Sequence, residues 1–233
     1  APISITYKGE NSFNFAFDVV DTLGRSKPDK LAIMHIAEDG TENRITFSQV
    51  KRASAQCANY FKSLGIKRGD RVMLVLKRRY QFWYAMIGLH KLGAIAIPAT
   101  NQLKEHDYEY RFNTAGVKAI ICVDDDYVIE QAEAALAKCP EVSVRILVGD
   151  EREGWKNFNE EYTLFSSHFE RNDDSPCGDD PMLMYFTSGT SGYPKIALHN
   201  YKYPLGHFHT AKYWHCVNPD GLHFTISDTG WGK

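Results

Sequence analysis

The stretch PMLMYFTSGTSGYPK, residues 181–195, joins a strand pattern to a loop rich in glycine and hydroxyl groups. Its apolar run, Met182–Phe186, is typical of a buried parallel strand. Glycines let the backbone bring its N–H groups against an anion, and hydroxyls and lysine add donors for phosphate oxygens. A loop after such a strand lies at the carboxyl edge of an α/β sheet, where these folds bind ligands. We therefore predict a triphosphate site formed by Thr187, Ser188, Gly189, Thr190, Ser191, Gly192 and Lys195.

Two common phosphate motifs do not fit this loop. Only two residues separate its glycines and Lys195 follows a proline, so the pattern G-x-x-x-x-G-K-[ST] fails, and G-x-G-x-x-G fails as well. A flexible linker rich in Ser and Gly is an alternative that composition alone leaves open.

Upstream of the loop, short apolar runs alternate with segments of helical periodicity. Single helices between strands indicate βαβ units, which place the strands side by side in parallel. We therefore predict an α/β fold with a mostly parallel sheet and flanking helices. The predicted strands are Arg71–Leu76, Ile95–Ile97, Lys118–Val123, Val144–Val148 and Met182–Phe186, and the predicted helices are Tyr80–Leu92, Glu105–Ala115 and Tyr127–Lys138.

A β-hairpin and a capped helix precede this alternation. The hairpin joins Leu31–Ile36 to Glu42–Phe47 across an Asp-Gly turn. Thr46 then begins a helix with a capping box, because Gln49 lies three residues further on. By contrast, Glu151–Asp180 is polar and acidic without a sustained period, so we expect a long connection with one short helix.

Composition and charge exclude several classes of protein. The chain has 233 residues, 43% of them hydrophobic, which suffices for one large domain or two small ones with a core. A net charge of -2 gives no electrostatic reason to expect a nucleic acid partner. No apolar run approaches the length of about 20 residues that a membrane-spanning helix needs, so we expect no membrane insertion.

The cysteines and histidines do not indicate a disulfide framework or a metal centre. Five cysteines, an odd number without a C-x-x-C pair, and an N-terminus without a signal-peptide pattern favour a reducing cytoplasm. His207, His209 and His215 are the one candidate set of metal ligands, but no acidic or cysteine ligand accompanies them. We therefore predict a cytoplasmic protein without a metal site of its own.

The order of residues in Tyr185–Lys195 resembles the signature loop of the adenylate-forming, AMP-binding enzymes, which include acyl-CoA synthetases, peptide-synthetase adenylation domains and luciferases. Three upstream segments, ITFSQV (45–50), GIKRGDRV (65–72) and KLGAIAIP (91–98), are similar to further landmarks of that family and occur in the family's order. Phe224–Trp231 looks most like the medium-chain acyl-CoA synthetase branch. The chain thus resembles the N-terminal part of an acyl-CoA synthetase.

The resemblance implies a two-step ligation. A carboxylate attacks the α-phosphorus of ATP to give an acyl-adenylate and pyrophosphate, and the thiol of coenzyme A then displaces AMP. The implied cofactors are ATP, Mg²⁺ and coenzyme A, and the implied small-molecule partner is a carboxylic acid, a fatty acid of short or medium length. The loop would hold the β- and γ-phosphates of ATP. Asp228 is a candidate polar neighbour of the acid, with a purely structural turn as the alternative, and Trp231 is a candidate wall of its pocket.

Other landmarks of the family are missing from residues 1–233. The sequence has no later Tyr-Gly-x-Thr-Glu segment, no hinge and no C-terminal lid domain with the lysine that completes adenylation. We therefore expect a truncated N-terminal part of the large domain, without a catalytic residue of its own and inactive as a ligase. The predicted strand Leu222–Ile226 would lack neighbours, so its apolar face and Trp231 are expected to be either covered by a second copy or poorly ordered. Such an oligomer would be an artefact of truncation.

Two other functions and two residue clusters stay open. The chain could belong to an adenylation domain that passes its acyl group to a carrier protein, or act as a non-catalytic nucleotide-binding module. Lys77-Arg78-Arg79 follows a strand and could meet a nucleotide phosphate, although a solvated loop explains it as well. The aromatic residues of segment 201–214 could line an acyl tunnel, whereas the spacing of four residues of this region is also typical of a core helix: Leu205, Phe208, Ala211 and His215.

Overall fold

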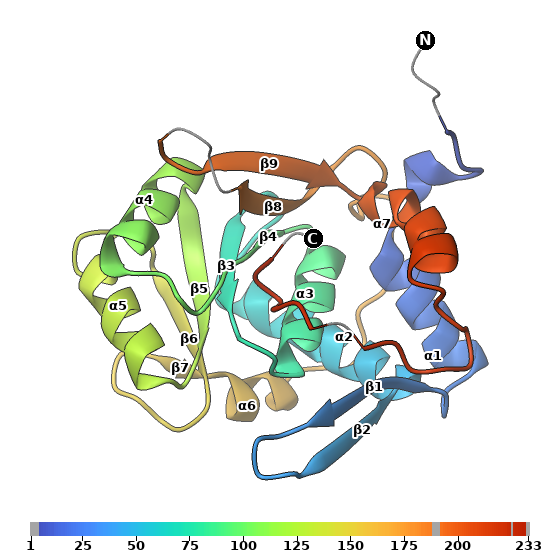
Figure 1. Cartoon of the computed structure of the whole chain (residues 1–233), viewed down its shortest axis with the longest axis horizontal. Coiled ribbons are helices and arrows are strands. Elements are labelled where there is room, and N and C mark those ends of the chain that lie inside the picture. The colour runs from blue at the N-terminus through green and yellow to red at the C-terminus, as the bar shows by residue number, and fades with distance from the viewer. Residues whose placement is uncertain (1–4, 188–191, 225, 232–233) are drawn as a thin grey trace.

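A computed structural model of the protein describes residues 5–187, 192–224 and 226–231, and Figure 1 shows their arrangement. The main sheet has seven strands in the order β7-β6-β5-β3-β4-β8-β9. Neighbouring strands run parallel except for β8 and β9, which are antiparallel, and this confirms the predicted α/β fold. The strands are β3 (Arg71–Val75), β4 (Ile95–Pro98), β5 (Val117–Val123), β6 (Val144–Val148), β7 (Lys156–Asn157), β8 (Pro181–Thr187) and β9 (Lys195–Asn200).

Helices cover both faces of the sheet. Figure 1 shows α4 and α5 together on one side of the sheet and α2 and α3 on the other. The chain steps from β3 to β4 through α3 and returns past β3 to β5 through α4, so these two crossovers lie on opposite faces. The loops after β3 and β4 therefore diverge at the carboxyl edge of the sheet, where ligands bind in such folds. The helices are α2 (Phe47–Ser63), α3 (Gln81–Leu92), α4 (Glu105–Ala115) and α5 (Asp126–Leu136).

The N-terminal hairpin and the capped helix form as the sequence predicts. The strands β1 (Leu31–Ile36) and β2 (Glu42–Thr46) pair antiparallel in a separate two-stranded sheet. The Thr46 hydroxyl oxygen accepts a hydrogen bond from the Gln49 backbone N–H at 3.4 Å. In return, the Gln49 side-chain oxygen accepts one from the Thr46 N–H at 2.7 Å. This reciprocal pair is the capping box, and it places the start of α2 directly after β2.

The connection between β6 and β8 is more structured than the sequence predicts. It contains β7, the helix α6 (Phe158–Glu161) and a 3₁₀ turn (Tyr162–Leu164), where the pattern predicts one short helix. Phe158 is fully buried and its ring lies against the ring of Tyr60 on α2. A single buried aromatic residue in an acidic segment produces no periodicity, so the pattern does not reveal this anchor.

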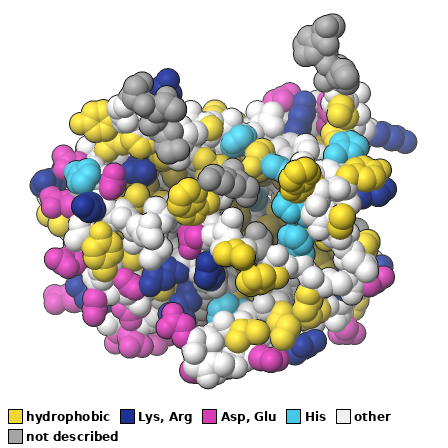
Figure 2. All heavy atoms as spheres, in the orientation of Figure 1, with side chains coloured by type: hydrophobic (Ala, Val, Ile, Leu, Met, Phe, Trp, Pro, Cys, Tyr) yellow, Lys and Arg dark blue, Asp and Glu magenta, His cyan; other side chains and the backbone are white. Residues whose placement is uncertain are grey.

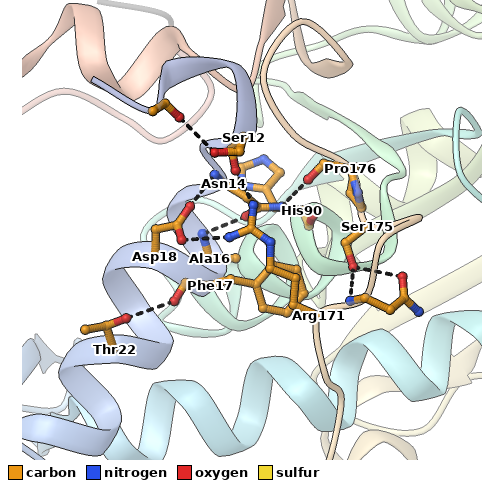
Figure 3. A network of polar contacts seen from close by, with 12 residues as sticks. Ser12, Asn14, Ala16, Phe17, Asp18, Thr22, His90, Arg171, Ser175 and Pro176 are labelled. Carbon is orange, nitrogen blue, oxygen red and sulfur yellow. Dashed lines mark hydrogen bonds and ion pairs between the residues drawn. The ribbon is translucent and has the colours of Figure 1, made fainter. Parts of the chain in front are cut away.

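A polar network fixes the later part of this connection to the N-terminal segment (Figure 3). The Arg171 guanidinium contacts the Asp18 carboxylate at 2.7 Å. The Asn14 side-chain amide donates to the backbone carbonyls of Pro176, at 2.8 Å, and His90, at 3.2 Å. These bonds join three segments that are distant in sequence, so the chain is held in place just before it forms β8. The N-terminal segment itself contains a 3₁₀ turn (Glu10–Ser12), a π-helix (Ala16–Asp21) and α1 (Thr22–Ser26).

The prediction of a strand over Leu222–Ile226 is wrong. Its described residues, 222–224 and 226, are irregular coil, and the Phe224 side chain is 85% exposed. The alternation of apolar residues in this segment is real, but a strand needs a neighbour to satisfy its backbone groups. Within the described part of the chain, no strand pairs with this segment.

The segment between β9 and residue 222 also lies on the surface. It forms α7 (Tyr203–Gly206) and a short π-helix (Thr210–Trp214). Tyr201 is fully buried, and its hydroxyl donates to the His90 carbonyl at 2.8 Å, while Tyr203 packs partly buried against the core. Figure 2 shows hydrophobic and histidine side chains on the face where Figure 1 draws this segment. The alternative that the helical spacing of this region marks a core helix is therefore wrong. None of the four residues with this spacing is buried: Leu205, Phe208, Ala211 and His215.

Candidate nucleotide-binding site

The glycine-rich loop begins and ends on two paired strands. Thr187 is the last residue of β8 and Lys195 the first of β9, and the two residues lie opposite each other in the antiparallel ladder. The Thr187 hydroxyl donates to the Lys195 carbonyl at 3.3 Å. Gly192 has a φ of 103°, which glycine adopts without strain. The other predicted phosphate ligands lie outside the described residues: Ser188, Gly189, Thr190 and Ser191.

The strand β9 is a feature that the sequence interpretation misses. Its pairing with β8 turns the loop into the tip of a hairpin, so both ends of the loop are set by one ladder. Because β8 also runs parallel to β4, the loop lies at the same sheet edge as the end of β4. The available signal is the alternation of Ile196 and Leu198 directly after the loop, which is short for a strand assignment.

A cavity of about 320 Å³ opens beside the loop. Its walls come from the end of β4, the end of β8 and the last described residues of the chain. A mostly apolar wall with a few polar groups is typical of a small-molecule site. The structure therefore brings the loop together with a cavity at the predicted edge of the sheet. The lining of the cavity includes Ala99, Leu103, Arg111, Tyr185, Phe186 and Trp231.

Arg111 is a charged residue of this cavity that sequence reasoning misses. It lies on α4, where its guanidinium stands over the Phe186 ring at 5.1 Å and donates to the Asp107 backbone carbonyl at 3.0 Å. The Arg111 side chain is only 12% exposed. Burial lowers the pKa of Arg111 from its usual value, and the Asp107 carboxylate partly opposes this effect. No local pattern marks this residue, because α4 meets the end of β8 only in the folded chain.

Asp228 and Trp231, the candidate acid-site residues, lie on a turn that packs against the end of β4. The Asp228 carboxylate accepts a hydrogen bond from the Gly230 N–H at 2.9 Å, and the Asp228 carbonyl accepts one from the Trp231 N–H at 3.1 Å. A Cβ on Gly230 would lie 2.4 Å from the backbone of Ala99 and Thr100, so a glycine is required there. Trp231 lines the 320 Å³ cavity, and both Asp228 and Trp231 line a neighbouring cavity of about 490 Å³.

The basic segment Lys77-Arg78-Arg79 follows β3 and lines this second cavity. Lys77 forms an ion pair with Asp125, and the hydrogen bond from Lys77 holds the pKa of that carboxyl below its usual value. Arg78 donates to the backbone carbonyl of Ile226 at 2.8 Å. Two of the three cations therefore join the end of β3 to neighbouring segments.

The three histidines considered as metal ligands do not converge. His207, His209 and His215 are exposed, and their rings contact other aromatic rings of the same surface segment. Among the residues that the structure describes, no three His, Cys, Asp or Glu side chains lie close enough together to hold a metal ion.

A glycine-rich loop at the carboxyl edge of a parallel sheet, beside an apolar cavity, is the arrangement of a nucleotide-binding α/β protein. Residues 20–228 match the model of the AMP-binding enzyme family, and the chain therefore belongs to this family. The resemblance seen in the loop is thus confirmed.

Curated relatives agree with this family. Human mitochondrial acyl-coenzyme A synthetase ACSM5 is 33% identical over 229 residues, which are 95% of this chain and 39% of that protein. Human mitochondrial ACSM3 is 32% identical over 233 residues, or 95% of this chain and 38% of that protein. The similarity to these two synthetases agrees with the branch of the family that the segment Phe224–Trp231 resembles. The chain spans about two fifths of the length of these relatives.

Two solved structures resemble the protein. An acyl-CoA synthetase from Brucella canis superposes with a TM-score of 0.81 at 22% identity, covering 95% of this chain and 40% of that one, and shows the shared fold. The anthranilate CoA ligase AuaEII, in complex with anthranoyl-AMP, superposes with a TM-score of 0.72 at 27% identity, covering 88% of this chain and 37% of that one.

The expected cytoplasmic location is contradicted, because the similar acyl-coenzyme A synthetases ACSM5, ACSM3 and ACSM4 are all named as mitochondrial proteins. The inference rested on unpaired cysteines, which indicate a reducing environment but do not tell one reducing compartment from another. The described residues contain no helix that is both long enough and apolar enough to cross a membrane.

Proposed function

We propose that this chain provides the ATP-phosphate site of an acyl-CoA synthetase. In the proposed reaction a carboxylate attacks the α-phosphorus of ATP, pyrophosphate leaves, and the thiol of coenzyme A then displaces AMP from the acyl-adenylate. The observation that carries the proposal is the loop of residues 187–195, whose ends pair at the carboxyl edge of the sheet beside a cavity. Membership of the AMP-binding family and similarity to acyl-CoA synthetases support it.

The ends of the loop suit the β- and γ-phosphates. Lys195 is exposed at the end of the loop and offers a cation, and the Thr187 hydroxyl stands at its start. Arg111 adds a second cation on the cavity side, so the site can offset part of the charge of a triphosphate. Mg²⁺ bound to the phosphates, with water as its other ligands, would offset more of that charge.

The apolar wall of the cavity suits the acyl group. Leu103, Tyr185 and Trp231 present hydrophobic surface there, and burial raises the pKa of Tyr185 to about 12, so its hydroxyl stays neutral at physiological pH. Small-molecule sites typically enclose about 300–1,000 Å³, and a cavity near the lower limit favours a fatty acid of short or medium length. Asp228, which lines the neighbouring cavity that Trp231 also lines, would be a polar neighbour of this acid.

We further propose that residues 1–233 correspond to the N-terminal part of the large domain of such an enzyme. The groups that bind adenine and ribose, and the lid domain that completes adenylation, would then lie elsewhere in the protein. The 233-residue chain alone is accordingly expected to show no exchange between ATP and pyrophosphate.

Thioester formation by the complete gene product tests the proposal. The protein would be incubated with Mg²⁺, ATP, coenzyme A and short- and medium-chain fatty acids, and both pyrophosphate exchange and acyl-CoA would be measured. Lys195→Ala should slow exchange by roughly 100-fold, the typical effect of losing one donor to a transition state. Lys62→Ala, at an exposed lysine in the last turn of α2, is the matched control and should have no effect.

The other outcomes separate the alternatives. Exchange followed by transfer to a carrier domain, but not to coenzyme A, would favour the adenylation-domain alternative. Binding of ATP without exchange for any acid would favour a non-catalytic nucleotide-binding module and would overturn the proposed ligase activity.

A further inference from the structure

Tyr110 on α4 contacts the end of the glycine-rich loop in two ways. Its hydroxyl donates to the backbone carbonyl of Pro194 at 2.9 Å. Its ring stacks on the ring of Tyr193, with centroids 4.7 Å apart and planes inclined by 19°. The same ring also meets Phe186, near the end of β8, edge to face at 6.2 Å. One side chain therefore touches residues on both sides of the loop.

The helix that carries Tyr110 is a firm support. Tyr108, Phe112 and Ala115 bury the opposite face of α4, which packs against α5 and β5. The Arg111 side chain, next in sequence, is held against Phe186 and the Asp107 carbonyl. Because α4 is anchored on α5 and β5 as well as on β8, Tyr110 can transmit a fixed position from the helix to the end of the loop.

The end of the loop needs such support more than its start. β8 is joined to β4 on one side and to β9 on the other. In the described part of the chain, β9 pairs only with β8 and so forms an edge of the sheet. Lys195 is the first residue of this edge strand and is exposed. Without another contact, the position of Lys195 depends on the β8–β9 ladder alone.

We propose that Tyr110 is a positioning residue for the phosphate loop. It holds Tyr193 and Pro194 in place, so Lys195, the next residue, meets the β- and γ-phosphates of ATP from a position that is set before the nucleotide binds. A binding residue that is positioned in advance loses less conformational freedom on binding, which strengthens affinity. This inference rests on the proposed function of the loop and adds a second element, α4, to the nucleotide site.

The inference makes a prediction that simple packing does not make. AMP has no β- or γ-phosphate, so a residue that positions the phosphate loop should matter for ATP and not for AMP. A residue that merely stabilises the fold should lower the melting temperature, and any effect on affinity should be shared by both nucleotides.

Four single variants of the complete gene product, and the double variant Tyr110→Leu with Tyr193→Leu, test this by calorimetric titration with MgATP and with AMP. Tyr110→Phe keeps the stacked ring and removes the hydroxyl, whereas Tyr110→Leu removes both contacts. Tyr193→Leu removes the stacking partner from the loop side. Tyr108→Phe is the matched control, because it deletes a buried hydroxyl two residues away that has no hydrogen-bond partner among the described residues.

We expect Tyr110→Phe to weaken ATP binding by about 3- to 10-fold, the effect of one lost hydrogen bond, with AMP binding unchanged. Tyr110→Leu should weaken ATP binding further, and adding Tyr193→Leu to it should cause little additional loss, because the stack is already absent. Tyr108→Phe should change neither affinity. Unchanged ATP affinity in both Tyr110 variants, or equal weakening of ATP and AMP, would overturn the positioning role.

The same experiment separates this inference from the proposed function. If the unmodified protein binds ATP no more tightly than AMP, the phosphate site itself fails. If it prefers ATP, loses that preference in Lys195→Ala and keeps it in both Tyr110 variants, only the positioning role fails.

Discussion

His90 is expected to make the protein sensitive to acid. It lies on α3 with 5% of its surface exposed, and neither ring nitrogen has a hydrogen-bond partner among the described residues. Its backbone carbonyl accepts a hydrogen bond from the Asn14 side chain, which Figure 3 shows, and a second from the Tyr201 hydroxyl. The helix is therefore held in place around the ring. Burial lowers the pKa of His90 from 6.5 to about 3.

The direction of the effect follows from this lowered pKa. Below pH 6.5 the unfolded chain binds a proton at His90 that the folded chain does not bind, so the free energy of unfolding falls as the pH drops. The contribution of neutral His90 to the free energy of unfolding is complete above pH 6.5 and is lost progressively down to about pH 3. At about 1.36 kcal/mol for each pKa unit, the gap between the two pKa values corresponds to a contribution of about 5 kcal/mol to the free energy of unfolding. About 2 kcal/mol of this contribution is lost between pH 8 and pH 5.

Urea unfolding of His90→Leu at pH 8 and pH 5 measures this contribution. Between pH 8 and pH 5, the free energy of unfolding of the unmodified protein should fall by about 2 kcal/mol more than that of the variant. At pH 8 the variant should be at least as stable, because two buried polar atoms without partners are removed. His106→Leu, at an exposed position of α4, is the control and should leave the pH dependence unchanged. An equal loss in His90→Leu and the unmodified protein would refute the reasoning.

Three further changes probe the fold. Gly230→Ala should detach the turn from the end of β4, because the new methyl group would lie 2.4 Å from backbone atoms. Acrylamide should then quench the fluorescence of Trp231 more strongly, and unchanged quenching would contradict this. Lys91→Met should lower the free energy of unfolding in urea by about 3–5 kcal/mol, because it leaves the buried Asp21 without its partner at 2.7 Å. Adding Asp21→Leu should restore most of this free energy, and additive losses would contradict the pairing. The isolated chain should self-associate through its exposed apolar residues near position 224, so its mass in solution should fall on dilution and in Phe224→Ser. A strict monomer at every concentration would argue against this surface.

Local chemistry explains why much of the fold could be predicted from the sequence. The capping box of Thr46 and Gln49 involves residues three positions apart, so it is visible in the sequence and forms as expected. The buried strands β3 and β5 are apolar runs because helices cover both faces of the sheet. Leu222–Ile226 shows the limit of this reasoning, because alternation predicts a strand only where a neighbouring strand exists to pair with it.

The sequence indicates the loop of the candidate site but not the residues around it. Thr187 and Lys195 lie at the two ends of the loop, as the glycine-rich pattern indicates. Arg111 and Tyr110 reach the site from a helix more than seventy residues upstream, and no spacing in the sequence links them to the loop. Their role depends on how α4 packs beside the β8–β9 hairpin, which is a property of the folded chain alone.

The central claim is that the loop binds the β- and γ-phosphates of ATP. Calorimetric titration of the complete gene product and its Lys195→Ala variant with MgATP and with AMP tests this claim most directly. The unmodified protein should bind ATP more tightly than AMP, and Lys195→Ala should remove most of that difference without changing the affinity for AMP. Equal affinities for the two nucleotides, or a preference for ATP that Lys195→Ala leaves intact, would contradict the claim.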